Sequence, residues 1–81
     1  MKIVYILRSA KYPKRLYVGL TEDLENRIKE HNRNESIYSK NYAPWNLETY
    51  IVFKENNVAM SFEKYLKSGS GFAFLKKRLL P

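Results

Sequence analysis

The sequence contains no cysteine among its 81 residues. Disulfide bonds and thiolate metal sites are therefore excluded, and the composition fits a reducing compartment, so we expect a cytoplasmic protein. No apolar run approaches the ~20 residues that span a bilayer, and Met1 leads directly into a strand-like segment instead of a signal peptide. We expect no membrane partner. Internal repeats, low-complexity segments and linkers are also lacking, which predicts a single domain over residues 1–81.

Acidic residues are few relative to basic ones. Fifteen Lys and Arg stand against eight Asp and Glu, which gives a net charge of +7. In a domain this small, that excess favours polyanionic partners, nucleic acid among them, although a basic protein with a solvated surface is the other interpretation. Hydrophobic residues make up 44% of the chain, which argues against disorder and allows one core with one sheet and a few helices.

Two short apolar runs predict a pair of strands near the N-terminus. Lys2–Arg8 contains a continuous apolar run that is rich in β-branched and aromatic residues, which is typical of a strand buried on both faces. Leu16–Leu20 is the second strand, and Gly19 is expected to end it by allowing a sharp turn or a close approach to the main chain. The short link favours antiparallel neighbours, which places Tyr5 and Tyr17 side by side.

The next segment, Leu24–His31, predicts a helix. Asp23 or Thr21 is a suitable N-cap, and the acidic residues around them suit the positive end of the helix dipole. Arg27 and the histidine at position 31 are four residues apart, so they lie one turn apart on a face beside the apolar stripe.

Residues 32–44 are polar and irregular and are the best candidate for a flexible binding loop. The segment carries Arg33, Tyr38, Lys40 and Tyr42. Aromatic rings interleaved with cations suit stacking on nucleic-acid bases together with phosphate contact. An ordinary surface loop, whose tyrosines cover the edge of the core, is an equally favoured interpretation.

The segment Trp45–Phe53 predicts the third strand. Its alternation places four side chains on one side of the sheet: Leu47, Thr49, Ile51 and Phe53. The whole order is strand, strand, helix, strand, helix, helix. That order predicts a small α+β domain, in which helices pack against a three-stranded, largely antiparallel sheet.

Two helices are predicted after the third strand. The first covers Val58–Lys67 and follows a turn whose last residue, Asn57, is the expected N-cap. Its expected apolar stripe consists of Val58, Phe62, Tyr65 and Leu66. Ser70 is expected to cap the second helix over residues 71–80, with Phe72, Leu75 and Leu79 facing inward.

The reactive groups on these elements are Tyr5, Tyr17, Arg27, His31 and Glu63. Their order and placement resemble a GIY-YIG nuclease domain, specifically the small stand-alone members related to the N-terminal domain of the excinuclease C subunit. The two motifs that name the family match residues 4–6 and 17–19. Its arginine, one helix turn before a histidine, matches Arg27 and His31, and its metal-binding glutamate matches Glu63. The resemblance covers nearly the whole chain.

The resemblance implies an endonuclease, dependent on Mg²⁺ or Mn²⁺, that acts on branched, damaged or single-stranded DNA. Glu63 would hold the metal, and Arg27 would grip phosphate oxygens in a forked geometry. Tyr17 is the family's candidate base or water-orienting group, with Tyr5 beside it. A free phenol has a pKa of about 10, so a base of this kind needs a neighbouring cation or metal-bound water. His31 is a second candidate base, or it positions Tyr17 or the phosphate.

Gly19 and Lys67 join the loop residues as predicted nucleic-acid contacts. Each site residue also has a purely structural interpretation. Tyr5 would be an ordinary core residue, and Arg27 and His31 would lie on a solvated helix face. Glu63 would form a surface ion pair worth about 0.3–0.5 kcal/mol.

The sequence departs from the family pattern at two places. Leu20 follows the second motif where several members carry lysine, and residues 72–75 lack the asparagine that many members have beyond the glutamate. These departures support an alternative function, a nucleic-acid-binding or accessory module with weak or lost catalysis. Nothing in the sequence distinguishes a monomer from a weak dimer.

Overall fold

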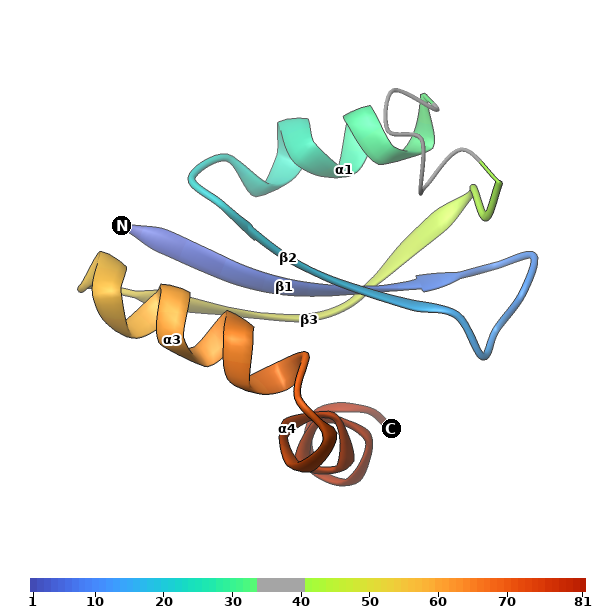
Figure 1. The fold of residues 1–81 in the computed structure, drawn as a ribbon. Coiled ribbons are helices and arrows are strands. Elements are labelled where there is room, and N and C mark those ends of the chain that lie inside the picture. The colour runs from blue at the N-terminus through green and yellow to red at the C-terminus, as the bar shows by residue number, and fades with distance from the viewer. Residues whose placement is uncertain (34–40) are drawn as a thin grey trace.

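One antiparallel sheet separates two groups of helices (Figure 1). The computed structural model describes residues 1–33 and 41–81, and its strands are β1 (Lys2–Ser9), β2 (Leu16–Thr21) and β3 (Trp45–Phe53). They pair in the order β2-β1-β3, so β2 and β3 form the edges of the sheet. The predicted α+β class and the three-stranded antiparallel sheet are confirmed.

The helices lie on opposite faces of this sheet. Helix α1 (Leu24–Asn32) covers one face, and α3 (Asn56–Leu66) and α4 (Gly69–Phe74) cover the other, as Figure 1 shows. A π-helical segment, η1 (Leu75–Leu79), continues α4 toward the C-terminus. None of the helices in the described ranges is long and apolar enough to cross a bilayer.

The central strand β1 contributes to a core on each face of the sheet. Val4 and Ile6 pack with residues of α3 and η1, whereas Tyr5 and Leu7 pack with Trp45 and residues of α1. All four of these β1 side chains are buried. This alternation explains why the β1 sequence is continuously apolar, and it confirms the prediction that both faces of the strand are buried.

The register of β1 with β2 brings the two motif tyrosines together. Tyr5 pairs with Gly19, and Leu7 pairs with Tyr17, so both tyrosines lie on the α1 face with ring centroids 6.2 Å apart. The prediction that Gly19 ends the strand is wrong, because β2 continues to Thr21. The Tyr5 ring lies over the glycine, where a Cβ atom would come within 2.3 Å of the phenol oxygen. The second reason given for a glycine, close approach to the main chain, is the correct one.

A β-bulge changes the predicted sides of β3. Ile6 pairs with Thr49 but Leu7 pairs with Leu47, so Glu48 is an extra residue between two pairs. Cross-strand partners share a face, so Leu47 and Thr49 lie on opposite faces and the predicted common side is wrong. The bulged Glu48 accepts a hydrogen bond from the Arg8 guanidinium at 2.8 Å.

The C-terminal helices begin earlier than predicted. Helix α3 starts at Asn56 with Glu55 as its N-cap, not Asn57, and its buried stripe uses Ala59 where Val58 was expected. The Val58 side chain is 51% exposed. Ser68, not Ser70, caps α4, because its Oγ accepts a hydrogen bond from the backbone N–H of the glycine at position 71.

Besides Val58, two other residues of the C-terminal helices that were predicted to face inward are partly exposed. Tyr65 and Phe72 expose 42% and 38% of their surfaces, whereas Leu75 is buried as predicted. The exposed Phe72 therefore remains available for contact with a partner.

Candidate active site

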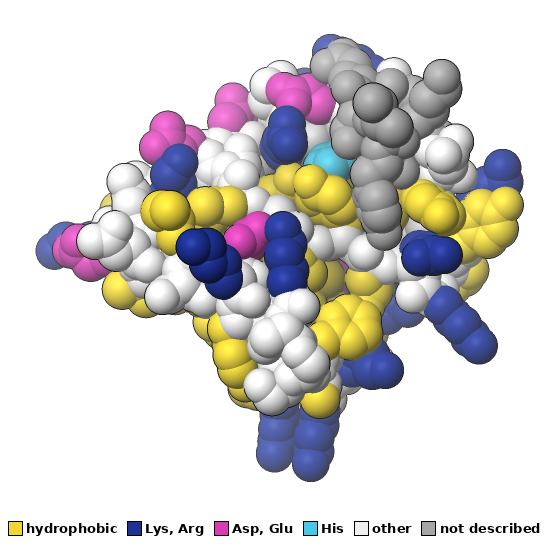
Figure 2. Space-filling view, viewed as in Figure 1, with side chains coloured by type: hydrophobic (Ala, Val, Ile, Leu, Met, Phe, Trp, Pro, Cys, Tyr) yellow, Lys and Arg dark blue, Asp and Glu magenta, His cyan; other side chains and the backbone are white. Residues whose placement is uncertain are grey.

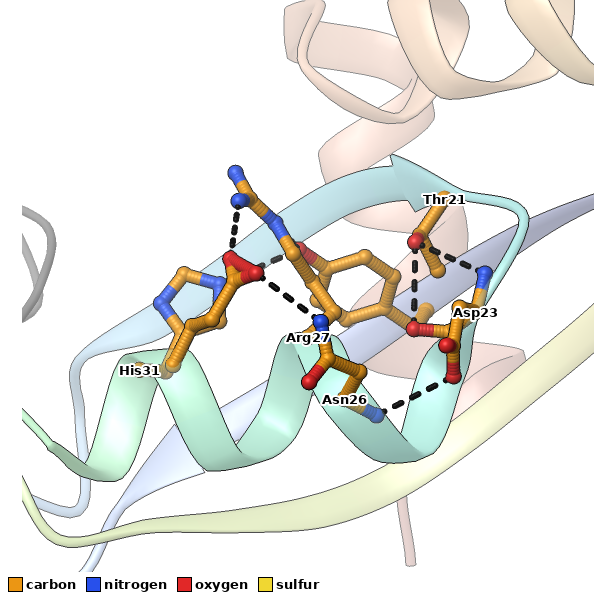
Figure 3. A network of polar contacts seen from close by, with 7 residues as sticks. Thr21, Asp23, Asn26, Arg27 and His31 are labelled. Carbon is orange, nitrogen blue, oxygen red and sulfur yellow. Dashed lines mark hydrogen bonds and ion pairs between the residues drawn. The ribbon is translucent and has the colours of Figure 1, made fainter.

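Helix α1 begins where the sequence predicts and carries two of the predicted site residues. Asp23 is the N-cap, and its side chain accepts a hydrogen bond from the backbone N–H of Asn26 at 3.2 Å. Figure 3 shows this cap together with Arg27 and His31 further along the helix. The cap fixes the start of α1 and therefore the direction in which both side chains project.

Tyr5 links these two side chains. Arg27 Nε donates a hydrogen bond to the Tyr5 hydroxyl at 3.3 Å, and this hydroxyl lies 3.0 Å from His31 Nε2. Complete burial raises the pKa of Tyr5, so its phenol stays protonated at neutral pH and donates to Nε2. That assignment puts the imidazole proton on Nδ1. Tyr5 thus acts as a connector that positions Arg27 and His31.

His31 is a buried, neutral imidazole. Burial lowers the pKa of His31, and the neighbouring Arg27 charge lowers it further. Its ring packs edge-on against Tyr17, with centroids 4.5 Å apart, and its Nδ1 has no hydrogen-bond partner among residues 1–33 and 41–81. The interpretation of His31 as part of a solvated helix face is wrong, because only 1% of the residue is exposed.

This burial gives His31 a measurable effect on stability. Because its folded-state pKa is lowered, the unfolded chain binds the proton first as the pH falls below about 6.5, and stability decreases. We expect the free energy of unfolding from urea titrations to drop by up to about 1.4 kcal/mol between pH 7.5 and 5.5. His31 is the only histidine, so His31→Gln should remove this drop. An equal drop in the variant would contradict a buried, neutral His31.

Arg27 is oriented from two sides and keeps donors to spare. Besides its bond to Tyr5, its Nη1 donates to Glu30 at 2.8 Å, and the hydrogen bond to Tyr5 raises the pKa of Arg27 so that it stays charged. The side chain is 40% exposed, and its three other N–H donors make no bond with the described residues. These donors suit a phosphate. Glu30 was missed from the sequence, although its i,i+3 spacing from Arg27 was a usable signal.

Tyr17 borders an open hollow at the sheet edge. The half-buried ring lies on edge strand β2, and the hollow, of about 330 Å³, is lined by Leu16, Tyr17, Val18, Leu66, Lys67 and Phe72. We call it the β2 hollow. It joins β2 to the region where α3 ends and α4 begins. Of the two motif tyrosines, Tyr17 is the one that lines this space.

Glu63 approaches the same edge from the other face of the sheet. Helix α3 packs against β2, and Glu63 Oε2 lies 2.5 Å from the ammonium of Lys67, which lines the β2 hollow. The Glu63 side chain is 17% exposed and that of Lys67 is 53% exposed. Figure 2 shows that acidic and basic side chains are close to one another on this face of the molecule. Glu63 therefore forms the helical ion pair that its structural interpretation predicted.

A metal at this edge would have a single protein carboxylate. The described residues contain no group of three or more His, Asp or Glu side chains that could hold an ion. Mg²⁺ is commonly bound by one or two carboxylates together with water and phosphate, so the Glu63 carboxylate fits such an ion. In the structure the Lys67 ammonium occupies this carboxylate.

The other predicted nucleic-acid contacts are dispersed. Arg33 is exposed at the end of α1, and Tyr38 and Lys40 lie outside the described residues. Tyr42 packs on Trp45, with ring centroids 6.3 Å apart, and belongs to the core on the α1 face. The interpretation that loop tyrosines cover the core edge therefore describes Tyr42. Gly19 is covered by the Tyr5 ring, and Lys67 is paired with Glu63.

Asn32 fixes the end of α1 to the start of β3. Its side-chain oxygen accepts from the backbone N–H of Trp45 at 2.6 Å, and its amide donates to the Trp45 carbonyl at 3.2 Å. This two-bond contact holds the adjacent His31 against the sheet. No sequence signal identified Asn32, because its partner is 13 residues away in the chain.

Comparisons with known proteins identify the family to which the chain belongs. A family model described as the GIY-YIG catalytic domain matches residues 1–77. The chain is 34% identical over 71 residues to the structure-specific endonuclease subunit SLX1 of Debaryomyces hansenii, an alignment that covers 79% of the chain and 20% of that protein. No solved structure matches the chain.

Two smaller relatives are UPF0213 proteins. The one from Haloquadratum walsbyi is 37% identical over 54 residues, covering 65% of the chain and 61% of the relative. The one from Clostridium perfringens is 37% identical over 68 residues, covering 83% and 71%. The chain thus spans about a fifth of the length of SLX1 and less than two thirds of the Haloquadratum protein. Since the family model covers nearly all of the sequence, the chain belongs to the GIY-YIG family.

Proposed function

We propose that this chain is a divalent-metal-dependent endonuclease that hydrolyses phosphodiester bonds in DNA, with Mg²⁺ as the metal. Membership of a catalytic-domain family and similarity to an endonuclease subunit support nuclease chemistry. One structural observation carries the proposal further. Tyr17 from β2 and Lys67, the partner of Glu63, line the same open hollow, although their elements belong to different layers of the fold.

Glu63 would hold the metal. A divalent cation bound there would polarise the phosphate and increase the acidity of a bound water. Binding requires the Lys67 ammonium to leave the carboxylate, and the long, half-exposed lysine side chain can then turn toward a phosphate oxygen. Lys67 also brings a cation to the hollow that Leu20 does not provide, because Leu20 packs against the core on the α3 face.

The remaining residues bind and orient the substrate. Tyr17, on the edge strand that borders the hollow, would direct the attacking water through its hydroxyl. Arg27 stabilises charge on the phosphate with its free N–H donors. Tyr5 and His31 act as positioning residues, since the Tyr5 hydroxyl holds Arg27 and the His31 ring supports that of Tyr17.

Cleavage of DNA by Tyr17→Phe tests this arrangement. We expect wild-type protein to cut labelled single-stranded or branched DNA in Mg²⁺ or Mn²⁺, and the variant to be about 100-fold slower. Tyr50→Phe is the matched control, since that tyrosine is 52% exposed on the opposite edge strand, and it should cut like wild type. Equal rates for wild type and Tyr17→Phe would exclude the proposed role of the hydroxyl.

A second candidate function is nucleic-acid binding without turnover. The observation that favours it is the short Glu63–Lys67 pair, which already neutralises the proposed metal ligand. This function predicts salt-sensitive DNA binding with no cleavage at any metal concentration.

A further inference from the structure

A second hollow adjoins the β2 hollow. Its volume is about 480 Å³, and its wall includes Arg8, Lys14 and Lys76. We call it the basic hollow. Leu16 and Phe72 line both hollows, so the two hollows adjoin each other between Tyr17 and the C-terminal helices, and we call them together the path.

The excess positive charge of the path lies in the basic hollow, since Lys67 in the β2 hollow is paired with Glu63. Among the residues that the structure describes, no Asp or Glu lines either hollow. Arg8 is neutralised by Glu48, whereas Lys14 and Lys76 make no ion pair with any described residue. In Figure 2, acidic and basic side chains are mixed over α1, whereas basic side chains project around the region of α4 and the C-terminus. A polyanion is therefore attracted to the α4 side of the site.

An aromatic ring stands between the two hollows. Phe72 is 38% exposed on α4, and the ammonium of Lys76, one turn later, lies 5.3 Å from its ring centroid. When the ammonium that lies over this ring turns to a phosphate, the partly exposed ring offers stacking for a base, and these are the two contacts by which proteins bind single strands. Paired bases within a duplex cannot offer a free face to such a ring.

We propose that single-stranded DNA flanking the cleaved bond follows this path, with one base stacked on Phe72 and neighbouring phosphates at Lys14 and Lys76. The inference rests on the proposed function in that it names the substrate form of the same site. It assigns binding roles to three residues that neither the motifs nor the sequence pattern indicated.

Binding without metal tests the ring. In fluorescence anisotropy with a labelled 12-nucleotide oligothymidylate in EDTA, Phe72→Leu should bind about 5- to 10-fold more weakly, because leucine keeps apolar volume but has no stacking face. Phe74→Leu is the control, since Phe74 is 37% exposed, packs on Phe62 and Tyr65 and lines neither hollow. It should bind like wild type. Wild-type affinity in Phe72→Leu would overturn the proposal.

The salt dependence of binding tests the lysines. Lys76→Gln should reduce the slope of log affinity against log salt by about 0.7, as expected for one lost single-strand phosphate contact. Lys77→Gln changes the same charge outside both hollows and should leave the slope nearly unchanged. Equal salt slopes for the two variants would contradict binding along the path. Polyglutamate that displaces the oligonucleotide as well as a DNA strand of equal charge would contradict it too.

Failure of this inference is distinguishable from failure of the proposed function. If Phe72→Leu binds and cuts like wild type while Tyr17→Phe is inactive, the path is wrong and the nuclease assignment stands. If Phe72→Leu weakens binding but no metal supports cutting by wild-type protein, the path stands and the nuclease assignment is wrong.

Discussion

Replacing Glu63 with glutamine is expected to slow DNA cleavage about 100-fold or more while leaving the fold intact. The glutamine has nearly the same shape but no charge, so it cannot hold a divalent cation at the β2 hollow. The lost helical ion pair with Lys67 is worth only about 0.3–0.5 kcal/mol, so unfolding does not account for the effect. Single-turnover cleavage rates measured across a Mg²⁺ titration give the result directly.

Glu25→Gln is the matched control for this variant. It removes another i,i+4 helical pair, since Glu25 lies 3.6 Å from Lys29 on α1. Because this pair is exposed and belongs to neither hollow, cleavage should stay within about twofold of wild type. Unchanged cleavage in Glu63→Gln, or an equal loss in Glu25→Gln, would remove Glu63 from the site.

Replacing Gly71 with alanine is expected to cause the largest loss of stability of any conservative change considered for this chain. A Cβ atom at this position would lie 1.6 Å from the backbone carbonyl oxygen of Tyr65. That oxygen belongs to α3 and cannot rotate away, so α4 would have to separate from α3. We expect a loss of about 3 kcal/mol, which corresponds to a fall in Tm of more than about 10 °C for a domain this small.

Gly69→Ala provides the comparison for this effect. No atom lies within 4 Å of a Cβ placed at Gly69, two residues earlier in the same helix. Alanine restricts the unfolded chain more than glycine does, so this variant should be as stable as wild type or slightly more stable. Equal Tm values for the two variants in thermal melts would show that α3 and α4 are not in the close contact described here.

Much of the fold was predictable because local pattern and burial agree. The continuous apolar run of β1 reflects packing on both faces, and the Asp23 cap marks the start of α1. The prediction of which side chains of α3 are buried was partly wrong, because burial there depends on how the helix is rotated about its axis. Ala59 is too small to stand out in a sequence, yet it faces the sheet, whereas the larger Val58 is exposed.

The sequence proposed a set of site residues, which stays a prediction, but it could not give the contacts among them. The resemblance to the GIY-YIG motifs proposed five residues: Tyr5, Tyr17, Arg27, His31 and Glu63. The hydrogen bonds that join Tyr5 to α1 depend on tertiary structure and left no local signal. Phe72 was assigned to the core because its spacing is helical, and only the packing of α4 shows that it lines the two hollows.

The most direct test of the account is cleavage of a labelled single-stranded or branched DNA by wild-type protein, measured with Mg²⁺ and again with excess EDTA. We predict cleavage that rises and saturates with Mg²⁺ concentration and stops completely in EDTA. Cleavage that continues at the same rate in EDTA, or DNA binding with no cleavage at any Mg²⁺ or Mn²⁺ concentration, would contradict a metal-dependent nuclease built on Tyr17 and Glu63.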